Sequence, residues 1–200
     1  ILKKIMNEFK FNGFNNFNVI VNYKSNILKT YFNVYKKEHK LSFVEEKDPL
    51  GTAGGLYLLN KIKNTFFISN CDILVKSDYK EILNYHKKNK NILTIVACLK
   101  NVRIPYGVCE VNKNSLLKKM REKPEFDYLV NTGFYLAEPL ILKHVPKKTF
   151  FNMDDLINNL RSKKFKIGVY PIRDNSWLDV GQWHEFRRTM NIIKDKPDQN

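Results

Sequence analysis

The sequence predicts an α/β fold: a mixed, mainly parallel sheet with helices on both faces. In the first half of the chain, short apolar runs alternate with segments in which apolar residues recur at helical spacing. Two of those runs, 65–69 and 92–99, are mostly apolar without alternation, as in strands that are covered on both faces. Helices between successive strands are the connection that parallel strands require, so the first half predicts parallel pairing.

The elements of the first half follow in order from local patterns. Apolar residues at helical spacing over 1–9 predict a helix, with Gly13 at a capping position. Ser25 is placed to cap a second helix. A glycine-rich turn, Pro49–Gly55, leads into a helical segment at 56–62. The remaining elements expected here are strands at 17–21, 41–45, 65–69 and 92–99 and a helix at 77–88.

The second half predicts hairpins and then a return to helices. Short polar links separate its first strands, which is typical of antiparallel pairs. The expected elements are strands at 106–111, 116–121, 129–136 and 167–171 and helices at 139–144, 153–163 and 182–193. We expect one domain over 1–193 and a polar tail over 194–200. Because the chain starts at Ile1 inside a helical pattern, we expect this domain to be truncated at its N-terminus.

Composition argues against several classes of protein. The chain has 200 residues, of which 43% are hydrophobic, so it can bury a core, but no apolar run reaches the ~18 residues that span a bilayer. Three cysteines without CxxC spacing argue against a disulfide framework or a zinc site and favour a cytoplasmic protein. The net charge of +15 is spread along the chain without a nucleic-acid motif, so we expect no nucleic-acid partner.

Two aspartates are candidate metal ligands. Asp72 follows the apolar run 65–69, and ligands of open α/β sheets bind beyond such strand ends. Asp179 lies in Trp177–Gly181, before a predicted helix. Carboxylates suit Mg²⁺, which prefers oxygen ligands. Both aspartates could instead cap helices, because Asp is favoured at that position.

Three further segments could contact a ligand. The turn Leu50–Gly55 can bring backbone N–H groups close to a ligand, although it is neither a Walker loop nor GxGxxG. Lys123 could bind a phosphate and Glu122 could accept hydrogen bonds from hydroxyls, or both could be solvated surface residues. Asn131-Thr132-Gly133 places glycine inside a predicted strand, where a close approach to the backbone would justify it.

The order of these segments is more specific than any one of them. It resembles the sugar-phosphate nucleotidyltransferase family, and most closely the guanylyltransferases that act on mannose 1-phosphate or an amino-sugar 1-phosphate. The segments that carry the resemblance are Pro49–Gly54, Ser69–Asp72, Tyr106–Val108, Glu122–Pro124, Asn131–Gly133 and Trp177–Gly181. The fold implied is the Rossmann-like sheet of the nucleotide-diphospho-sugar transferase type.

The resemblance also implies roles for individual residues. Asp72 and Asp179 would bind Mg²⁺, the expected cofactor, and with Lys123 would form the catalytic set. The nucleotide would be lined by Leu50, Gly51, Thr52 and Ala53. The sugar phosphate would be bound by Gly107, Glu122, Lys123 and Asn131. Some relatives carry a regulatory pair of CBS modules at the N-terminus, so these modules are possible partners of the catalytic domain.

Two features depart from the family pattern. Cys71 stands where the family usually has glycine between Asn and Asp. The strand and Gly-x-Gly-Thr-Arg loop with which the family opens, and which holds the triphosphate, occur nowhere in the 200 residues. We therefore expect these residues alone to have little activity, because a lost charge-stabilising group typically costs about 10²–10³ in rate.

The implied reaction is transfer of a nucleotidyl group from a nucleoside triphosphate, with GTP favoured, to a sugar 1-phosphate, giving a nucleotide-sugar and pyrophosphate. Two alternatives remain. A metal-dependent glycosyltransferase has a similar architecture but often shows Asp-x-Asp, whereas Ser69–Asp72 offers one aspartate. A non-catalytic subunit that binds nucleotide-sugars is the other.

Overall fold

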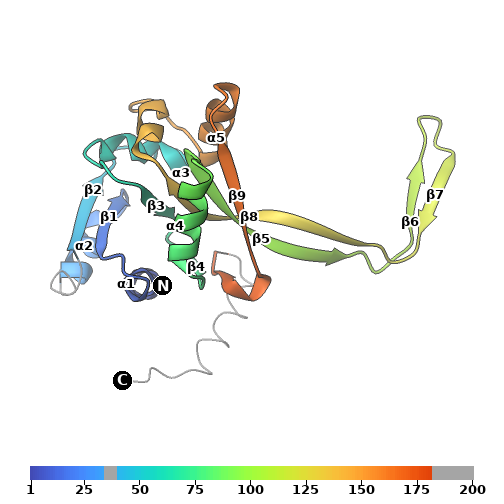
Figure 1. Cartoon of the computed structure of the whole chain (residues 1–200), viewed down its shortest axis with the longest axis horizontal. Coiled ribbons are helices and arrows are strands. Elements are labelled where there is room, and N and C mark those ends of the chain that lie inside the picture. The colour runs from blue at the N-terminus through green and yellow to red at the C-terminus, as the bar shows by residue number, and fades with distance from the viewer. Residues whose placement is uncertain (34–39, 182–200) are drawn as a thin grey trace, which may run out of the picture.

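The structure is a computed structural model that describes residues 1–33 and 40–181. It confirms a mixed α/β architecture with helices on both sides of a central sheet (Figure 1). The expected closing helix at 182–193 and the tail at 194–200 lie outside the described residues.

The first part of the chain forms two helices, a parallel strand pair and the helical turns that follow it. Strands β1 and β2 pair in parallel, from Asn16↔Lys40 to Val21↔Glu45. The elements are α1 (Leu2–Phe11), β1 (Asn16–Val21), α2 (Ser25–Asn33), β2 (Lys40–Glu45), α3 (Gly51–Gly54) and the 3-10 helix η2 (Gly55–Leu59).

The central sheet has the order β3-β8-β5-β9. Strand β8 runs antiparallel to both of its neighbours, whereas β5 and β9 are parallel. The elements of this part are β3 (Phe66–Ser69), β4 (Ile73–Val75), α4 (Tyr79–Lys88), β5 (Leu93–Arg103), β8 (Glu125–Ala137), η3 (Pro139–His144), α5 (Met153–Ser162), β9 (Ile167–Ile172), η4 (Asp174–Ser176) and β10 (Trp177–Asp179). Antiparallel pairs therefore contribute more to the mixed sheet than the sequence indicated.

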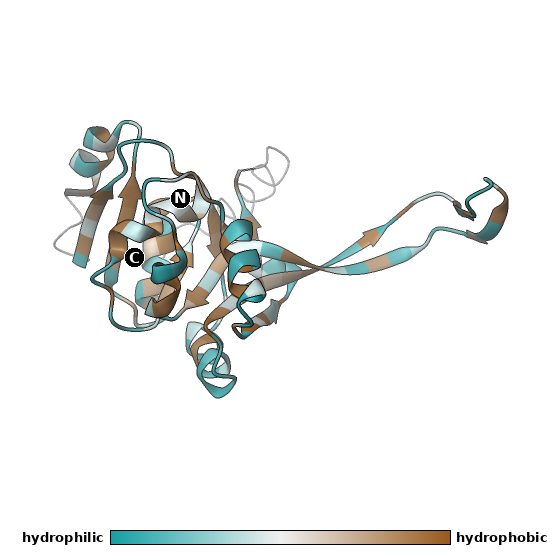
Figure 2. Ribbon diagram, turned by 90° about the horizontal axis from the view of Figure 1, so that it is seen from above, coloured by the Kyte–Doolittle hydropathy of each residue, from teal (hydrophilic) through white to brown (hydrophobic). Residues whose placement is uncertain are grey.

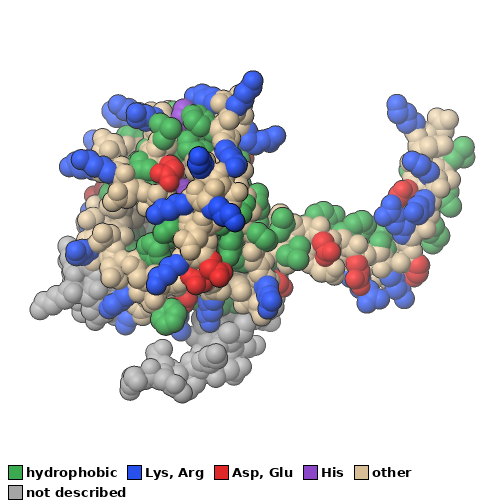
Figure 3. Space-filling view, viewed as in Figure 1, with side chains coloured by type: hydrophobic (Ala, Val, Ile, Leu, Met, Phe, Trp, Pro, Cys, Tyr) green, Lys and Arg blue, Asp and Glu red, His purple; other side chains and the backbone are tan. Residues whose placement is uncertain are grey.

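A long arm leaves this sheet. Strands β5 and β8 stay paired as far as Arg103↔Glu125, and the arm ends in a hairpin of β6 (Val108–Val111) and β7 (Leu117–Arg121). In Figures 1 and 3 the arm projects away from the body of the molecule. The expected strands at 92–99 and 129–136 are thus the inner halves of longer strands.

Two apolar cores lie on opposite faces of the sheet. On one face, Phe9 of α1 and Tyr79 and Ile82 of α4 pack against β8, and the ring of Phe9 stacks on Phe134 at 5.5 Å. On the other face, η2, η3 and α5 bury side chains such as Leu156. In Figure 2 the apolar colour is concentrated in the strands of the body. Helices therefore cover both faces, as predicted.

Two local features differ from expectation. Ser25 is the first residue of α2 rather than a residue before it, and its hydroxyl donates to Glu45 Oε1 at 2.6 Å, which ties α2 to β2. Strand β4, directly after Asp72, was not predicted; it has only three residues and its partner is β10, about a hundred residues later. Such a short strand leaves no periodic signal.

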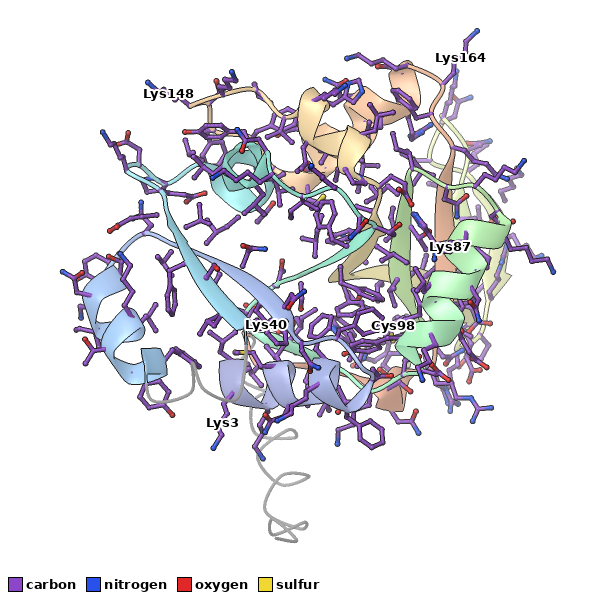
Figure 4. The ribbon with its side chains drawn as sticks, turned by 60° about the vertical axis from the view of Figure 1, so that its left-hand side comes forward. Lys3, Lys40, Lys87, Cys98, Lys148 and Lys164 are labelled. Atoms are coloured by element: carbon purple, nitrogen blue, oxygen red, sulfur yellow. The ribbon has the colours of Figure 1, made fainter. Side chains whose placement is uncertain are left out.

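The lysines are distributed around the body. The labelled lysines in Figure 4 come from different parts of the chain and are exposed, whereas the labelled Cys98 is buried. This arrangement agrees with a charge that is spread rather than gathered into one binding stripe. Across the described part of the chain, no helix combines the length and apolar character needed to cross a membrane.

His86 makes the stability of the fold dependent on pH. Its side chain is buried, with Nδ1 2.8 Å from Thr94 Oγ1 and Nε2 3.2 Å from Glu138 Oε1. Burial lowers the pKa of His86, and hydrogen bonding to Glu138 offsets this only in part. The unfolded chain takes up the proton near pH ~6.5 while the folded chain resists it. We therefore expect the contribution of His86 to the free energy of unfolding to be at its maximum above that pH and to decrease as the pH drops below it.

Urea denaturation between pH 5 and 8 measures this dependence. His86→Gln is the comparison, because it removes the titrating group while keeping a polar side chain. A pH profile that is the same in the variant and the parent chain would remove His86 from the explanation.

Candidate active site

The structure brings Asp72 and Asp179 together around Gly181. A Cβ placed on Gly181 would lie 2.8 Å from Asp72 Oδ2 and 3.2 Å from Asp179 Oδ1, so the two oxygens are no further apart than the sum of these distances. The Gly181 N–H also donates to Asp179 Oδ1 at 2.8 Å. Two carboxylates that are 107 positions apart in the sequence thus face one small space.

Strands β4 and β10 produce this convergence. They pair in antiparallel fashion with Asp179 opposite Ile73, the residue after Asp72. The Val180 N–H donates to the Asp72 carbonyl at 2.9 Å and continues the pairing past the strand ends. Because Leu178 and β4 are buried in the core, burial of apolar side chains holds the two aspartates in register.

The donor atoms suit a hard divalent cation. Mg²⁺ in proteins is commonly held by one or two carboxylates and keeps several waters. The carboxylates of Asp72 and Asp179 fit that pattern, because Asp72 is exposed and leaves room for water. Desolvation, and then the charge of Asp72, raise the pKa of the neighbouring Cys71 thiol. Within residues 1–33 and 40–181 there is no group of three or more His, Cys, Asp or Glu side chains placed to hold a metal.

The glycine-rich turn is fastened to the start of α5. The Ala53 and Gly54 N–H groups both donate to the Phe151 carbonyl, at 3.0 and 2.8 Å. The Thr52 N–H donates to Asn152 Oδ1 at 3.2 Å, and the Thr52 hydroxyl accepts from the Met153 N–H at 2.9 Å. The three amides that the sequence suggested for a ligand are therefore engaged inside the protein. The part of the turn that a ligand can contact is the surface of Gly51 and Thr52, which line the groove.

One groove of about 880 Å³ connects the turn with Asp72. Gly51 and Thr52 line it at one end, and residues 69–72 line it as well. Leu50 and Ala53 are buried in the core and do not line it. Of the four residues predicted to contact a nucleotide, Gly51 and Thr52 thus share a groove with the first metal candidate.

Glu46 is a groove residue that the sequence analysis missed. It lines the same groove, it is half-buried, and burial raises the pKa of its carboxyl despite a hydrogen bond from the Leu50 backbone. Its carboxylate lies against Gly55, where an added Cβ would collide with it. The signal was present: Glu46 follows the predicted strand 41–45 as Asp72 follows 65–69.

Asn131 lies at an irregularity in β8 near the Asp72 segment. The β5–β8 register shifts between Val96 and Ala97, and Gly133 takes a φ of 79°. A Cβ on Gly133 would stand 2.6 Å from Asn70 Nδ2, so the glycine permits a close approach of Asn70, two residues before Asp72. The exposed Asn131 donates through Nδ2 to the Tyr135 hydroxyl at 2.6 Å. A close approach to the backbone therefore explains the glycine at position 133, as its place inside a strand predicted.

Gly107, Glu122 and Lys123 form a separate group on the arm. A Cβ on Gly107 would lie 3.1 Å from Glu122 Oε2, and Lys123 Nζ is 3.9 Å from Glu122 Oε1. Both charged side chains are exposed. Figure 1 shows the hairpin of β6 and β7 far from β3 and β4, which flank Asp72. The structure therefore gathers the predicted site residues into two groups, one on the body and one on the arm.

Gly51→Ala is expected to unfasten the turn. Gly51 has a φ of 78°, and a Cβ would lie 2.6 Å from Asn152 Oδ1 and 2.8 Å from the Phe151 carbonyl oxygen. The left-handed conformation alone costs a non-glycine residue about 1–2 kcal/mol, and displacing the start of α5 adds to it. Gly13→Ala is the matched control, because Gly13 has a φ of 90° and nothing within 4 Å. Urea denaturation should show a larger loss of stability for Gly51→Ala; equal losses would contradict the fastening.

The chain is similar to known proteins over most of its length. The model of the nucleotidyl transferase family matches residues 1–196. Mannose-1-phosphate guanyltransferase 2 of Candida glabrata is 30% identical over 176 residues, covering 83% of this chain and 48% of that protein. The catalytic subunit beta of mannose-1-phosphate guanylyltransferase from Dictyostelium discoideum is 30% identical over 190 residues, covering 90% and 52%. This chain thus spans about half the length of these curated relatives.

Solved structures confirm the fold. HddC from Yersinia pseudotuberculosis superposes with a TM-score of 0.74 at 18% identity, covering 96% of this chain and 84% of that one. The same protein complexed with GMP-PN gives a TM-score of 0.69. A family model that matches nearly every residue, together with this fold and the order of the site segments, leads to one conclusion: the chain belongs to the nucleotidyl transferase family.

Proposed function

We propose that the protein transfers a nucleotidyl group from a nucleoside triphosphate, with GTP favoured, to a sugar 1-phosphate, and that pyrophosphate leaves. The observation that carries the proposal is the convergence of Asp72 and Asp179 in the same region as a groove that Gly51 and Thr52 line. Relatives named as mannose-1-phosphate guanyltransferases and a structural neighbour crystallised with GMP-PN support guanine and a mannose-like sugar.

In this proposal each group of residues has a distinct task. Gly51 and Thr52 contact the base and ribose, with Leu50 and Ala53 supporting them from the core. Asp72 and Asp179 hold Mg²⁺, which when bound neutralises charge on the phosphates. Glu122, Lys123, Gly107 and Asn131 bind the sugar phosphate. The reaction needs no nucleophile from the protein; in-line positioning and charge neutralisation supply the rate enhancement.

Lys123 and Glu122 lie on the arm, so productive binding requires the arm to approach the body. The backbone at Lys123 has a φ of 46°, an uncommon conformation for a lysine, and Pro124 follows it. Ile104 still pairs with Pro124 at this point, through a 3.0 Å bond from the Ile104 N–H. The bend between β5 and β6 is where we expect the arm to move.

Product analysis of the complete protein tests the proposed reaction. With GTP, mannose 1-phosphate and Mg²⁺, we expect a nucleotide-sugar and pyrophosphate in equal amounts. Free nucleoside diphosphate in place of pyrophosphate would indicate the alternative glycosyltransferase. Binding of the nucleotide-sugar without turnover would indicate the alternative non-catalytic subunit.

Residues 1–200 alone are expected to turn over at least about 10²-fold more slowly than the complete protein, because charge-stabilising groups on a triphosphate-binding loop typically contribute that much. Pyrophosphate release by both forms under one set of conditions measures the difference. Equal rates would show that these 200 residues contain the whole catalytic apparatus.

A further inference from the structure

The arm carries much of the exposed apolar surface of the chain. Nine of the eighteen large hydrophobic side chains that are exposed in residues 1–33 and 40–181 belong to residues 99–129, which form the arm and make up less than a fifth of those residues. Figure 3 shows apolar side chains in green along the arm. Exposed apolar residues that are scattered singly are normal, whereas a gathered set marks an interaction surface. The arm is therefore suited to contact another protein molecule.

The hairpin at the end of the arm has one apolar face and one charged face. Val111 of β6 stands opposite Leu117 of β7, and Met120 shares their face because its partner in β6 lies two residues before Val111. All three side chains are more than half exposed. The other face carries an ion pair between Arg121 and Glu110 at 2.7 Å. A strand pair with this alternation normally packs its apolar face on another layer, and a two-stranded hairpin alone is marginally stable in water.

The apolar area of the arm is large enough for an interface between two protein molecules. A large apolar side chain that is about half exposed offers on the order of 100 Å². Nine of them offer about 900 Å², compared with about 800 Å² that each partner contributes to a specific, stable interface. In a symmetric dimer both copies contribute the same surface. A second copy of this chain therefore brings an apolar face that matches the arm in size.

Within one chain, Lys123 is too far from Asp72 to share a sugar phosphate with it. Glu125 and Gly133 are eight residues apart on strand β8, which corresponds to about 26 Å at ~3.3 Å per residue. Gly133 adjoins Asn70, two residues before Asp72, whereas Lys123 lies beyond the Glu125 end of the strand. A lysine side chain and a sugar phosphate together span much less than the length of this strand.

Bending of the arm does not remove this separation. Strand β9 pairs with β5 as far as Cys98, so the sheet keeps three strands up to the start of the arm. From Cys98 the ladder of β5 and β8 continues without a break to Pro124, whose carbonyl accepts the Ile104 N–H. Lys123 is the next residue in the chain. Movement at the bend beyond Ile104 therefore turns the hairpin but leaves Lys123 at the far end of the paired strands.

We infer that the chain forms a symmetric dimer through its arm, in which Lys123 and Glu122 of each copy bind the sugar phosphate beside the Asp72 and Asp179 carboxylates of the other copy. Two arms of equal length that pack side by side about a two-fold axis run in opposite directions, so the end of each arm reaches the body of the partner. The body that the arm approaches is thus that of the second copy. The role of Lys123 rests on the proposed function, whereas the pairing through the arm does not.

Cross-linking of the complete protein locates the end of the arm independently of turnover. Cys71 is exposed and adjoins Asp72, so Lys123→Cys supplies the second thiol of the expected contact. Cys109→Ser removes the exposed thiol of the hairpin. A short bis-maleimide joins thiols that lie close together, denaturing electrophoresis separates links between copies from links within one chain, and mass spectrometry identifies the joined peptides. The same protein with Cys71→Ser is the matched control.

The expected product is a covalent dimer joined between position 71 of one copy and position 123 of the other, and the Cys71→Ser control should not form it. A link between these positions within one chain would overturn the inference. Absence of the link would overturn it as well, whether the protein sediments as a monomer or as a dimer.

Mixed dimers test whether each site is completed by the partner. Asp72→Asn and Lys123→Ala subunits with different affinity tags are produced together, and dimers that contain one of each are purified. One site of such a dimer keeps its Asp72 and receives an intact Lys123, and the other site has neither. We expect about half of the parent turnover from the mixed dimer, whereas each variant alone loses at least about 10²-fold.

A mixed dimer that is no more active than the two variants alone would overturn the inference. A parent protein without transferase activity would contradict the proposed function instead, and the cross-link between copies would then decide the dimer by itself.

Discussion

Asp72→Asn and Asp179→Asn in the complete protein are each expected to reduce turnover at least about 10²–10³-fold while leaving the fold intact. The amide keeps the size of the side chain but removes the negative charge that is proposed to hold a divalent cation. In this proposal the two carboxylates act on one ion, so the double variant should be little worse than either single variant. Both carboxylates border Gly181, and neither is in the apolar core, so Tm should change little.

Pyrophosphate release at saturating GTP and Mg²⁺ measures the loss. Asp154→Asn is a suitable control, because Asp154 is an exposed aspartate in the first turn of α5. Turnover at the parent rate in either site variant would remove that aspartate from the mechanism. Losses that multiply in the double variant would show that the two carboxylates act independently rather than on one ion.

The fold was predictable from the sequence wherever a segment carries its own periodic signal. Helical spacing of apolar residues over 1–9 predicted α1, which lies at Leu2–Phe11, and α5 was expected at 153–163 and lies at Met153–Ser162. The strands that extend into the arm were harder to predict. Beyond Leu99, β5 consists of Lys100 to Arg103, whose exposure resembles that of a loop. Cross-strand pairing with β8 keeps this segment extended, and a single-strand pattern cannot show such a partner.

The sequence also pointed to residues that the structure brings together. Asp72 was a candidate ligand because it follows an apolar run, and the order of the segments suggested Asp179 as its partner; both carboxylates border Gly181, and their metal-binding role stays a prediction. The use of the Ala53 and Gly54 amides was not predictable, because their acceptor, the Phe151 carbonyl, lies almost a hundred residues away in the sequence. Local chemistry indicates which groups could bind a ligand. Only the tertiary structure shows which of them are already occupied.

Gly181→Ala is expected to weaken binding of a divalent cation at least about tenfold without destabilising the protein. The φ of Gly181 is not in the left-handed region, so the backbone accepts alanine. The new Cβ would lie 2.8 Å from Asp72 Oδ2, closer than such contacts normally come, and 3.2 Å from Asp179 Oδ1. Asp72 is exposed, so its carboxylate end can rotate away at little cost in stability. Mg²⁺ demands near-ideal geometry, so moving one ligand oxygen lowers affinity steeply.

Titration with Mn²⁺, followed by its paramagnetic effect on water relaxation, measures this affinity apart from turnover. The effect of Gly181→Ala should be much smaller in an Asp72→Asn background, because the displaced oxygen no longer carries the charge that binds the ion. An equal loss of affinity in both backgrounds would mean that alanine acts elsewhere than through Asp72. Unchanged affinity in the single variant would mean that the space around Gly181 is not where the ion is held, and the shared-cation arrangement of Asp72 and Asp179 would fail with it.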